Sequence, residues 1–566
     1  MKIETSSGYL KAAQLGLIAG IVAMLICLVG MVQEFNEKDI IAGVITLGQT
    51  VIVVVFLMAG YSASGKLTQS RLGQTLAGAL AGFLTAGVLA VMVIVIDLYP
   101  DIRDIFLNAS PQLVEILTLG KGLNPGLFYL IGIGALVGAF GGFLHSLPGL
   151  VRRAVTMGIV WVVLLGLLEP LLQGMLNGFP SVQEALTWMF GKGMEEGLSV
   201  TGAVLVFMIV TGSTYLWGSR GKAVNARVQN LPKNQRKTLR WVSLAMLAVL
   251  LIYLPVVVGL YFSEVINQVG LFIMMALGLN IVVGFAGLLD LGYVAFYAIG
   301  AYTIAVLTNT SGELAWNFQW TFWQALPVAL FVATMAGIML GIPVLGIRGD
   351  YLAIVTLGFG EIIRILVLSD WLKPYLGGSQ GITRIPPIAI SIGPWEAVLN
   401  TPQTLYYFIL VGILALFFIA TRLRDSRLGR SWKALREDED VAEAMGINLV
   451  VTKLLAFATG AAFAGMAGAV LAPKLGTIYP HSFALLISIN VLAVIIIGGM
   501  GSIPGVFIGS LLLVGLPELL REFAEYRLWI YGALLVVMMQ TRPEGFLPEA
   551  TRKRELHEEN LMEAVE

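Results

Sequence analysis

Residues 422–453 read RLRDSRLGRSWKALREDEDVAEAMGINLVVTK and form a charged island in an otherwise apolar sequence. The first half of this stretch is basic, and the second half is acidic, with Glu437, Asp438, Glu439, Asp440 and Glu443. Apolar runs long enough to cross a bilayer flank it, and basic loops between such runs stay in the cytoplasm. We therefore expect a structured cytoplasmic loop between two transmembrane helices, where a soluble partner could act on a membrane protein.

The composition of the whole chain indicates a polytopic membrane protein. Its 566 residues are 57% hydrophobic and 12% charged, whereas soluble domains carry about 25% charged residues. Lys plus Arg and Asp plus Glu both number 35, which argues against a nucleic-acid partner. The three histidines are scattered without metal-ligand spacing, and Cys27 lies in an apolar run where we expect inert packing. We expect no metal and no cofactor.

Six apolar segments precede residue 220, and each is close to the length that a transmembrane helix needs. They cover residues 10–32, 40–62, 73–96, 127–147, 154–172 and 198–217. The first is too long for the apolar region of a signal peptide, so we read it as a span. Basic residues such as Arg71, Arg152 and Arg153 follow even-numbered spans, which places the amino terminus in the cytoplasm.

A strongly basic stretch at residues 218–240, GSRGKAVNARVQNLPKNQRKTLR, then interrupts the hydropathy. We interpret it as a cytoplasmic linker between an N-terminal six-span membrane domain (1–217) and a second membrane domain (241–550), followed by a charged tail (551–566). An ordinary loop within one helical bundle is the alternative.

Further apolar segments follow the linker, several of them short and interrupted by glycine, so we expect eight to ten crossings in an all-α second domain. They cover residues 241–262, 265–285, 288–308, 325–346, 351–369, 405–421, 453–472, 484–499, 503–517 and 528–541. Counting the crossings from a cytoplasmic amino terminus places the basic residues 422–436 and the tail with Arg552–Arg554 in the cytoplasm. The loop 370–404, rich in turn residues, falls on the outside.

Within the charged island, the spacing predicts one short amphipathic helix from about Ser431 to Met445. Its apolar stripe comprises Trp432, Leu435, Val441, Ala442 and Met445. Gly446 suits the left-handed position that ends a helix, and Ile447 follows as its hydrophobic contact. A solvated surface helix without a partner is the alternative, although the apolar stripe favours a covering membrane surface or docked subunit.

The pattern Asp440-Val441-Ala442-x-x-x-Gly446 resembles a degenerate form of the E-A-A-x-x-x-G coupling motif of ABC importer permeases. The surrounding residues 426–472 resemble the LivM-type permeases of branched-chain amino-acid importers. Three more blocks are similar to the same family in the same order, at residues 278–307, 348–366 and 491–513. The resemblance covers about residues 241–550 and does not extend to residues 1–220. Asp440 and Val441 replace the Glu and Ala of the motif.

This resemblance implies a transport function and a set of partners. The chain is expected to be a permease subunit in a bacterial inner membrane, with two cytoplasmic ABC ATPase subunits, an extracytoplasmic substrate-binding protein and a second, related permease subunit. It is not expected to be an enzyme, because no G-x-x-x-x-G-K-[ST] motif is present to hold a nucleotide. The resemblance implies an ATPase-coupling loop formed by Arg436, Glu437, Asp438, Glu439, Asp440, Ala442, Glu443 and Gly446.

Polar and glycine residues within the spans suggest where a translocation path could run. Irregular backbone at membrane depth is tolerated only inside protein or beside water. The irregular backbone expected at Gly284, Gly287, Gly501 and Pro504 makes these residues candidates for lining the path. Asn280 and Asn490 are candidates because they are polar residues in apolar runs. Glu361 and Arg364 stand three apart on one helical face, and we expect them to neutralise each other. Stripes of small residues, such as Ala461, Gly465 and Ala469, predict close helix packing.

Three alternatives remain open from the sequence. A urea or amide permease of the same family would tolerate the same near-neutral path. A stand-alone secondary transporter would carry substrate without any ATPase. Residues 1–220 could also be a sensor or scaffold fused to the permease, rather than part of the transport path.

Overall fold

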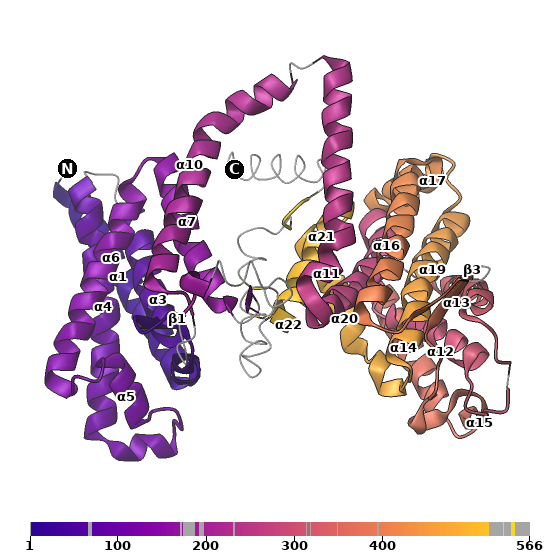
Figure 1. Cartoon of the computed structure of the whole chain (residues 1–566), viewed down its shortest axis with the longest axis horizontal. Coiled ribbons are helices and arrows are strands. Elements are labelled where there is room, and N and C mark those ends of the chain that lie inside the picture. Colours follow the sequence, from indigo (N-terminus) through magenta and orange to yellow (C-terminus); the bar gives the residue numbers. More distant parts are fainter. Residues whose placement is uncertain are drawn as a thin grey trace. The chain divides into compact units, whose positions relative to one another are not determined.

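A computed structural model describes the chain over residues 2–65, 71–169, 172–173, 187–191, 197–229, 232–312, 314–316, 318–347, 349–392, 395–519, 532, 536 and 545–548. These residues are helical apart from two short β-hairpins, and twelve of the helices are long and apolar enough to cross a membrane (Figure 1). The chain is therefore a multi-pass membrane protein, as predicted. It divides into two compact units, residues 1–250 and 251–566.

The first unit contains the six predicted N-terminal spans. Its long helices are α1 (Lys2–Leu28), α3 (Leu47–Ser64), α4 (Arg71–Leu98), α6 (Leu123–Ser146), α7 (Gly149–Leu167) and α10 (Val200–Gln229). Short elements join them: α2 (Met31–Glu34), η1 (Phe35–Glu37), β1 (Asp39–Ile41), β2 (Ile45–Thr46), η2 (Pro100–Asp104), α5 (Pro111–Leu117) and η3 (Thr187–Met189). The predicted linker, residues 218–240, lies in the end of α10 and the start of α11 (Lys233–Leu279).

Glycines bring the helices of the first unit into backbone contact. A Cβ atom at Gly82 of α4 would lie 2.1 Å from the carbonyl oxygen of Gly134 in α6. A Cβ at Gly60 of α3 would lie equally close, 2.1 Å, to the carbonyl oxygen of Gly138. Such close approach is how helices gain packing energy in lipid, where no hydrophobic effect drives their association. Cys27 is fully buried in this unit, in agreement with its predicted packing role.

The second unit carries the remaining spans. After α11 come η4 (Asn280–Phe285), α12 (Val294–Thr308), α13 (Phe322–Val344), α14 (Asp350–Leu368), α16 (Pro402–Asp425), α17 (Arg427–Glu437), α18 (Glu439–Ala444), α19 (Leu449–Leu475), α20 (Leu485–Gly498), α21 (Ile503–Ser510), η7 (Leu511–Gly515) and α22 (Leu516–Leu519). The predicted segments 241–262 and 265–285 form one long helical stretch with a kink at Gly259, where φ is +75°. The predicted span 528–541 and the tail with Arg552–Arg554 lie outside the described residues, except for isolated positions.

The loop predicted as a series of turns at residues 370–404 has a structure of its own. It contains α15 (Lys373–Leu376), η5 (Gly378–Gln380) and the antiparallel hairpin of β3 (Ile388–Ile392) with β4 (Trp395–Leu399). A second short 3-10 turn, η6 (Pro480–Phe483), precedes α20. Ile382 pairs with Ile478 in an isolated β-bridge, which links the loop to the segment that follows α19.

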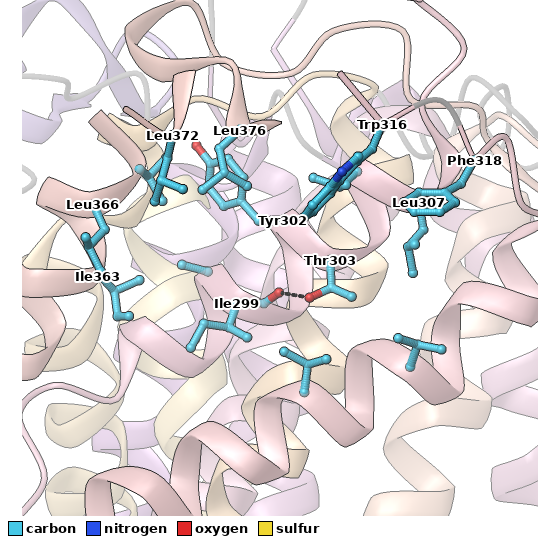
Figure 2. Close-up of a pocket in the computed structure, with 15 residues that line it drawn as sticks. Ile299, Tyr302, Thr303, Leu307, Trp316, Phe318, Ile363, Leu366, Leu372 and Leu376 are labelled. Atoms are coloured by element: carbon cyan, nitrogen blue, oxygen red, sulfur yellow. Dashed lines mark hydrogen bonds between the residues drawn. The ribbon is translucent and has the colours of Figure 1, made fainter. Parts of the chain in front are cut away.

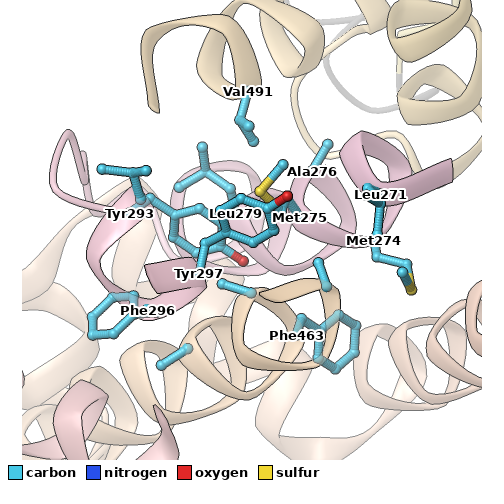
Figure 3. Packing of buried hydrophobic residues seen from close by; sticks show 14 of the residues in the cluster. Leu271, Met274, Met275, Ala276, Leu279, Tyr293, Phe296, Tyr297, Phe463 and Val491 are labelled. Carbon is cyan, nitrogen blue, oxygen red and sulfur yellow. The ribbon is translucent and has the colours of Figure 1, made fainter. Parts of the chain in front are cut away.

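The core of the second unit forms where α12 and α13 pack against α19. Figure 3 shows the part of this core in which residues of α11, such as Met275, lie near Tyr297 of α12 and Phe463 of α19. Small residues permit this contact, as predicted from their spacing: a Cβ at Gly300 of α12 would lie 2.3 Å from the carbonyl oxygen of Gly465, and a Cβ at Gly465 would lie 2.4 Å from the Cβ of Ala333 in α13. The Tyr293 hydroxyl is fully buried and donates a 2.8 Å hydrogen bond to the carbonyl oxygen of Gly460. This bond ties the start of α12 to the middle of α19.

Candidate functional site

The predicted single helix from Ser431 to Met445 is wrong, because the charged island folds as two helices. α17 ends at Glu437, and α18 begins at Glu439. Asp438 between them has an extended backbone, with φ −159° and ψ 121°. Its side chain accepts hydrogen bonds from the backbone N–H groups of Asp440 (2.8 Å) and Val441 (3.0 Å). An aspartate that caps a helix in this way favours starting a new helix over continuing the old one.

The end of α18 has the predicted geometry. Gly446 has φ +85°, the left-handed conformation that glycine adopts without steric cost. The Gly446 N–H donates to the Glu443 carbonyl at 2.9 Å, and the Ile447 N–H donates to the Ala442 carbonyl at 3.1 Å. These two bonds form a Schellman motif, which turns the chain sharply back toward α19.

The apolar stripe of the island is covered by the chain over part of its length. Trp432, Leu435 and Ala442 are buried, and the Trp432 indole N–H donates to the Thr452 carbonyl at 2.9 Å. Val441 and Met445 remain 59% and 79% exposed. The acidic side chains of Glu437, Asp438, Asp440 and Glu443 are also exposed. The two helices therefore present a surface with two uncovered apolar residues among carboxylates.

An ion pair attaches this surface to the transmembrane helices. Lys453, 3% exposed near the start of α19, contacts the Glu439 carboxylate at 2.8 Å. The same ammonium group donates to the Leu345 carbonyl, just after α13, at 3.4 Å. Because both groups are largely withdrawn from water, breaking this pair would be costly.

Arg436 connects the island to the middle of the second unit. Its guanidinium Nη1 donates a 2.8 Å hydrogen bond to the carbonyl oxygen of Gly284. Gly284 lies in the last turn of η4, a π-helical segment, and carbonyl groups at the end of a helix lack partners within that helix. A Cβ at Gly287, where φ is +72°, would lie 2.9 Å from the Arg436 side chain. The structure thus brings a predicted coupling residue into contact with two predicted path residues.

Asn280 connects η4 to the break between α20 and α21. Its Oδ1 accepts a 2.8 Å hydrogen bond from the N–H of Gly501, which lies between those helices with φ +83°. The Asn280 side chain is 1% exposed, and its Nδ2 has no hydrogen-bond partner among the described residues. Pro504 is the second residue of α21, behind the Ser502 cap. Asn490 lies in α20, half-buried.

Two residues not selected from the sequence, together with Asp290, accept hydrogen bonds from the backbone between η4 and α12. Thr356 of α14 accepts from the N–H of Leu291 at 3.0 Å, and Ser488 of α20 accepts from the N–H of Val294 at 2.9 Å. Asp290, fully buried, accepts from the N–H of Gly292 at 2.9 Å. The available signal was a lone Ser or Thr in an apolar span, which is too common to identify a partner.

The predicted neutralisation of Glu361 by Arg364 is confirmed. Arg364 Nε lies 2.9 Å from Glu361 Oε2 on α14. Among the described residues, no group of three or more His, Cys, Asp or Glu side chains could hold a metal ion.

Comparisons with known proteins place the second unit in a family. Residues 261–539 match the family described as "Branched-chain amino acid transport system / permease component". The chain is 42% identical over 324 residues to the high-affinity branched-chain amino acid transport system permease protein LivM of Escherichia coli, over 54% of this chain and 74% of LivM. The LivH permease of the same system in Escherichia coli is 27% identical, over 51% of this chain and 96% of LivH.

A more distant relative is the probable branched-chain amino acid transport permease protein LivM of Methanocaldococcus jannaschii, 22% identical over 51% of this chain and 93% of that protein. No solved structure matches the chain. The family match leaves residues 1–260 uncovered. The breaks at η4 and Gly501, the packing of α12 against α19 and the charged island all lie in the matched part. The chain belongs to the family of branched-chain amino acid transport system permease components, which are transporter subunits rather than enzymes.

Proposed function

We propose that this chain is the permease subunit of an ABC importer that carries branched-chain amino acids across the membrane. The observation that carries the proposal is the 42% identity to LivM, which spans 74% of that permease. As expected from such relatives, the chain would work with two ATPase subunits, an external substrate-binding protein and a second permease subunit of LivH type. LivM and LivH both resemble this chain, which supports pairing of two unlike permeases.

The coupling surface would be the pair α17 and α18, on the cytoplasmic side together with both termini. Val441 and Met445 are exposed among carboxylates, which suits a groove with apolar walls and a basic rim. Closure of the ATPase dimer would push on α18, and the Lys453–Glu439 pair would pass that motion to α13 and α19.

The path would open and close at the linked breaks. Arg436 contacts η4, and η4 contacts Gly501 through Asn280. A displacement of α17 therefore reaches both irregular segments without passing through a flexible loop. We propose that Asn280, Gly284, Gly287, Asn490, Gly501 and Pro504 border the path in at least one state of the transport cycle.

Reconstitution tests this function directly. Proteoliposomes that contain this chain, the second permease and the two ATPases should accumulate radiolabelled leucine only with ATP inside and binding protein outside. Uptake driven by an ion gradient, with this chain alone, would contradict the proposal and indicate a secondary transporter. Uptake of urea or amides in place of leucine would instead change the substrate class.

Contact with the ATPase can be tested in the same particles. A cysteine placed at Met445, in a Cys27→Ala background, should cross-link to an ATPase subunit. The matched control is a cysteine at Trp371, which is equally exposed at 78% but follows the C-terminal end of α14. This cysteine should not cross-link to an ATPase subunit. Cross-linking at Trp371 alone would contradict the proposed docking side.

A further inference from the structure

The helix α14 has one packed face and one uncovered face. Leu352, Ala353 and Val367 are buried against the rest of the second unit. Tyr351, Ile354, Ile362 and Ile365 are between 55% and 75% exposed on the opposite side. A Cβ at Gly358, on the same side, would meet no atom within 4 Å. In the described structure this side of a membrane-spanning helix has no protein cover.

Glu361 and Arg364 lie at the edge of this uncovered face. Their side chains are 35% and 40% exposed. Glu361 follows the first residue of α14 by eleven positions (361 − 350), so it lies roughly 16 Å along a helix of roughly 28 Å. That position is well inside the hydrocarbon layer of a bilayer, whose thickness is about 30 Å.

The pair is only partly satisfied. Arg364 Nε contacts Glu361 Oε2 at 2.9 Å, and among the described residues neither side chain makes another hydrogen bond or ion pair. A guanidinium has five N–H donors, and a carboxylate has about four acceptor positions. Most of the hydrogen-bonding capacity of the pair is therefore unused.

Contact with lipid hydrocarbon would be unfavourable for such a pair. Ionisable side chains at membrane depth face a bundle interior or a water-filled cavity, because hydrocarbon cannot solvate them. The described part of the second unit does not cover the pair, which therefore needs water, a polar solute or another protein surface as its neighbour. Water or a polar solute can meet this need where the edge of α14 that carries the pair borders the aqueous path of the permease.

An apolar cavity lies next to the pair, on the packed side of α14. Arg364, Ile363 and Val367 line a narrow pocket together with Tyr302. Tyr302, Ile363 and Val367 also line an adjoining cavity of about 470 Å³, below the loop that carries Trp316 and Phe318 (Figure 2). The Tyr302 hydroxyl is buried and has no hydrogen-bond partner among the described residues. The cavity volume lies in the range of small-molecule sites, about 300–1,000 Å³.

We propose that Glu361 and Arg364 form a site for the charged backbone of the transported amino acid. Glu361 would accept from the ammonium group, Arg364 would donate to the carboxylate, and the apolar side chain would lie toward the Tyr302 cavity. Arginine suits this role because its planar fork matches a carboxylate. The inference rests on the proposed function and adds the residues that recognise a zwitterion.

Removing both charges at once distinguishes a substrate-binding role of Glu361 and Arg364 from a purely structural role. Glu361→Gln and Arg364→Gln each leave one unpaired charge in the membrane, so both single variants should transport poorly under either role. The double variant E361Q/R364Q leaves no charge. Substrate binding predicts that leucine uptake by the reconstituted double variant is at least about tenfold below that of the parent. Uptake restored to within about twofold of the parent would overturn the proposal.

The ion pair of Glu264 with Lys474 provides the matched control. It also joins charged side chains in the second unit, one of them nearly buried, but it lies outside the α14 face. The double variant E264Q/K474Q should retain uptake. If the parent complex takes up no leucine, the proposed function fails. If the parent and E361Q/R364Q take it up equally, only this inference fails.

Thiol labelling tests the aqueous face with the pair intact, and so decides the matter even if the double variant does not assemble. In a Cys27→Ala background of the full complex, Ile365→Cys should react with a charged methanethiosulfonate reagent, because thiolate forms in water. Leucine with its binding protein should slow the reaction. Val411→Cys on α16, 64% exposed, should stay unreactive. Ile365→Cys as unreactive as Val411→Cys would overturn the proposal.

Discussion

Arg436 donates a 2.8 Å hydrogen bond to the carbonyl oxygen of Gly284, a residue 152 positions earlier in the chain. One partner belongs to the charged island, and the other belongs to a π-helical break within a membrane span. A charged donor makes this bond stronger than an ordinary backbone bond. The bond therefore joins the surface that would receive force to the segment that would move.

Arg436→Gln should uncouple hydrolysis from transport. The shorter, neutral side chain loses the bond to Gly284, which is worth about 1.5–3 kcal/mol when the donor is charged. We expect at least about tenfold less leucine carried per ATP hydrolysed, measured in proteoliposomes, with the complex still assembled. Arg430→Gln is the control, since Arg430 is exposed and donates at 3.3 Å only to the nearby Asp425 carbonyl. An equal loss of hydrolysis and transport would argue against a coupling role.

Asp438→Ala should weaken the start of α18. The variant removes the acceptor for the N–H groups of Asp440 and Val441, a loss of about 0.5–2 kcal/mol. Asp438→Asn keeps an oxygen that can accept these bonds, so its loss of stability should be much smaller than that of Asp438→Ala. The affinity of the purified permease for its ATPase subunits should fall for the alanine variant and change little for the asparagine variant. Equal affinities for both variants would show that the cap is not needed for docking.

The sequence predicted the twelve long apolar helices, the small-residue packing and the ion pair on α14, because these features depend on spacing along one helix. It did not predict the division into α17 and α18. The apolar stripe from Trp432 to Met445 continues through Asp438, and helix periodicity alone cannot tell a solvated aspartate from a capping one. The end at Gly446 was predictable because a left-handed glycine is a local signal.

The connections of the candidate site were beyond the sequence for a different reason. Asn280 was selected as a polar residue in an apolar run, but its partner Gly501 lies 221 positions away. The partners of Thr356 and Ser488 are backbone N–H groups, which carry no sequence signature. A single sequence predicts which groups need partners, whereas the tertiary fold determines which partners they find.

Lys453→Met should destabilise the permease more than the matching double variant does. The single change leaves the Glu439 carboxylate without its 2.8 Å partner in a site where Lys453 was 3% exposed. Breaking a buried pair costs about 3–5 kcal/mol, whereas replacing both members is often neutral. The thermal unfolding temperature in detergent should fall for Lys453→Met and recover in K453M/E439Q. If the double variant is as unstable as the single one, the methylene packing of Lys453 matters more than its charge.

Gly284→Ala should prevent the contact between η4 and the Gly501 break. The added Cβ would lie 2.2 Å from Asn280 Oδ1 and 2.7 Å from the Gly501 backbone nitrogen. Both distances are below van der Waals contact, so the Asn280–Gly501 bond must break or the segments must separate. The buried Gly501 N–H would then lose its acceptor, at a cost of about 1–3 kcal/mol.

Gly358→Ala is the matched control for this change, because a Cβ there meets no atom within 4 Å. The yield of assembled complex and its unfolding temperature should fall for Gly284→Ala and stay at the parent level for Gly358→Ala. Asn280→Ala should restore part of the stability of Gly284→Ala, since it removes the nearest clashing atom. If the double variant is as unstable as Gly284→Ala alone, the steric conflict lies with the Gly501 backbone. In that case backbone contact, and not only the Asn280 side-chain bond, holds η4 against the Gly501 break.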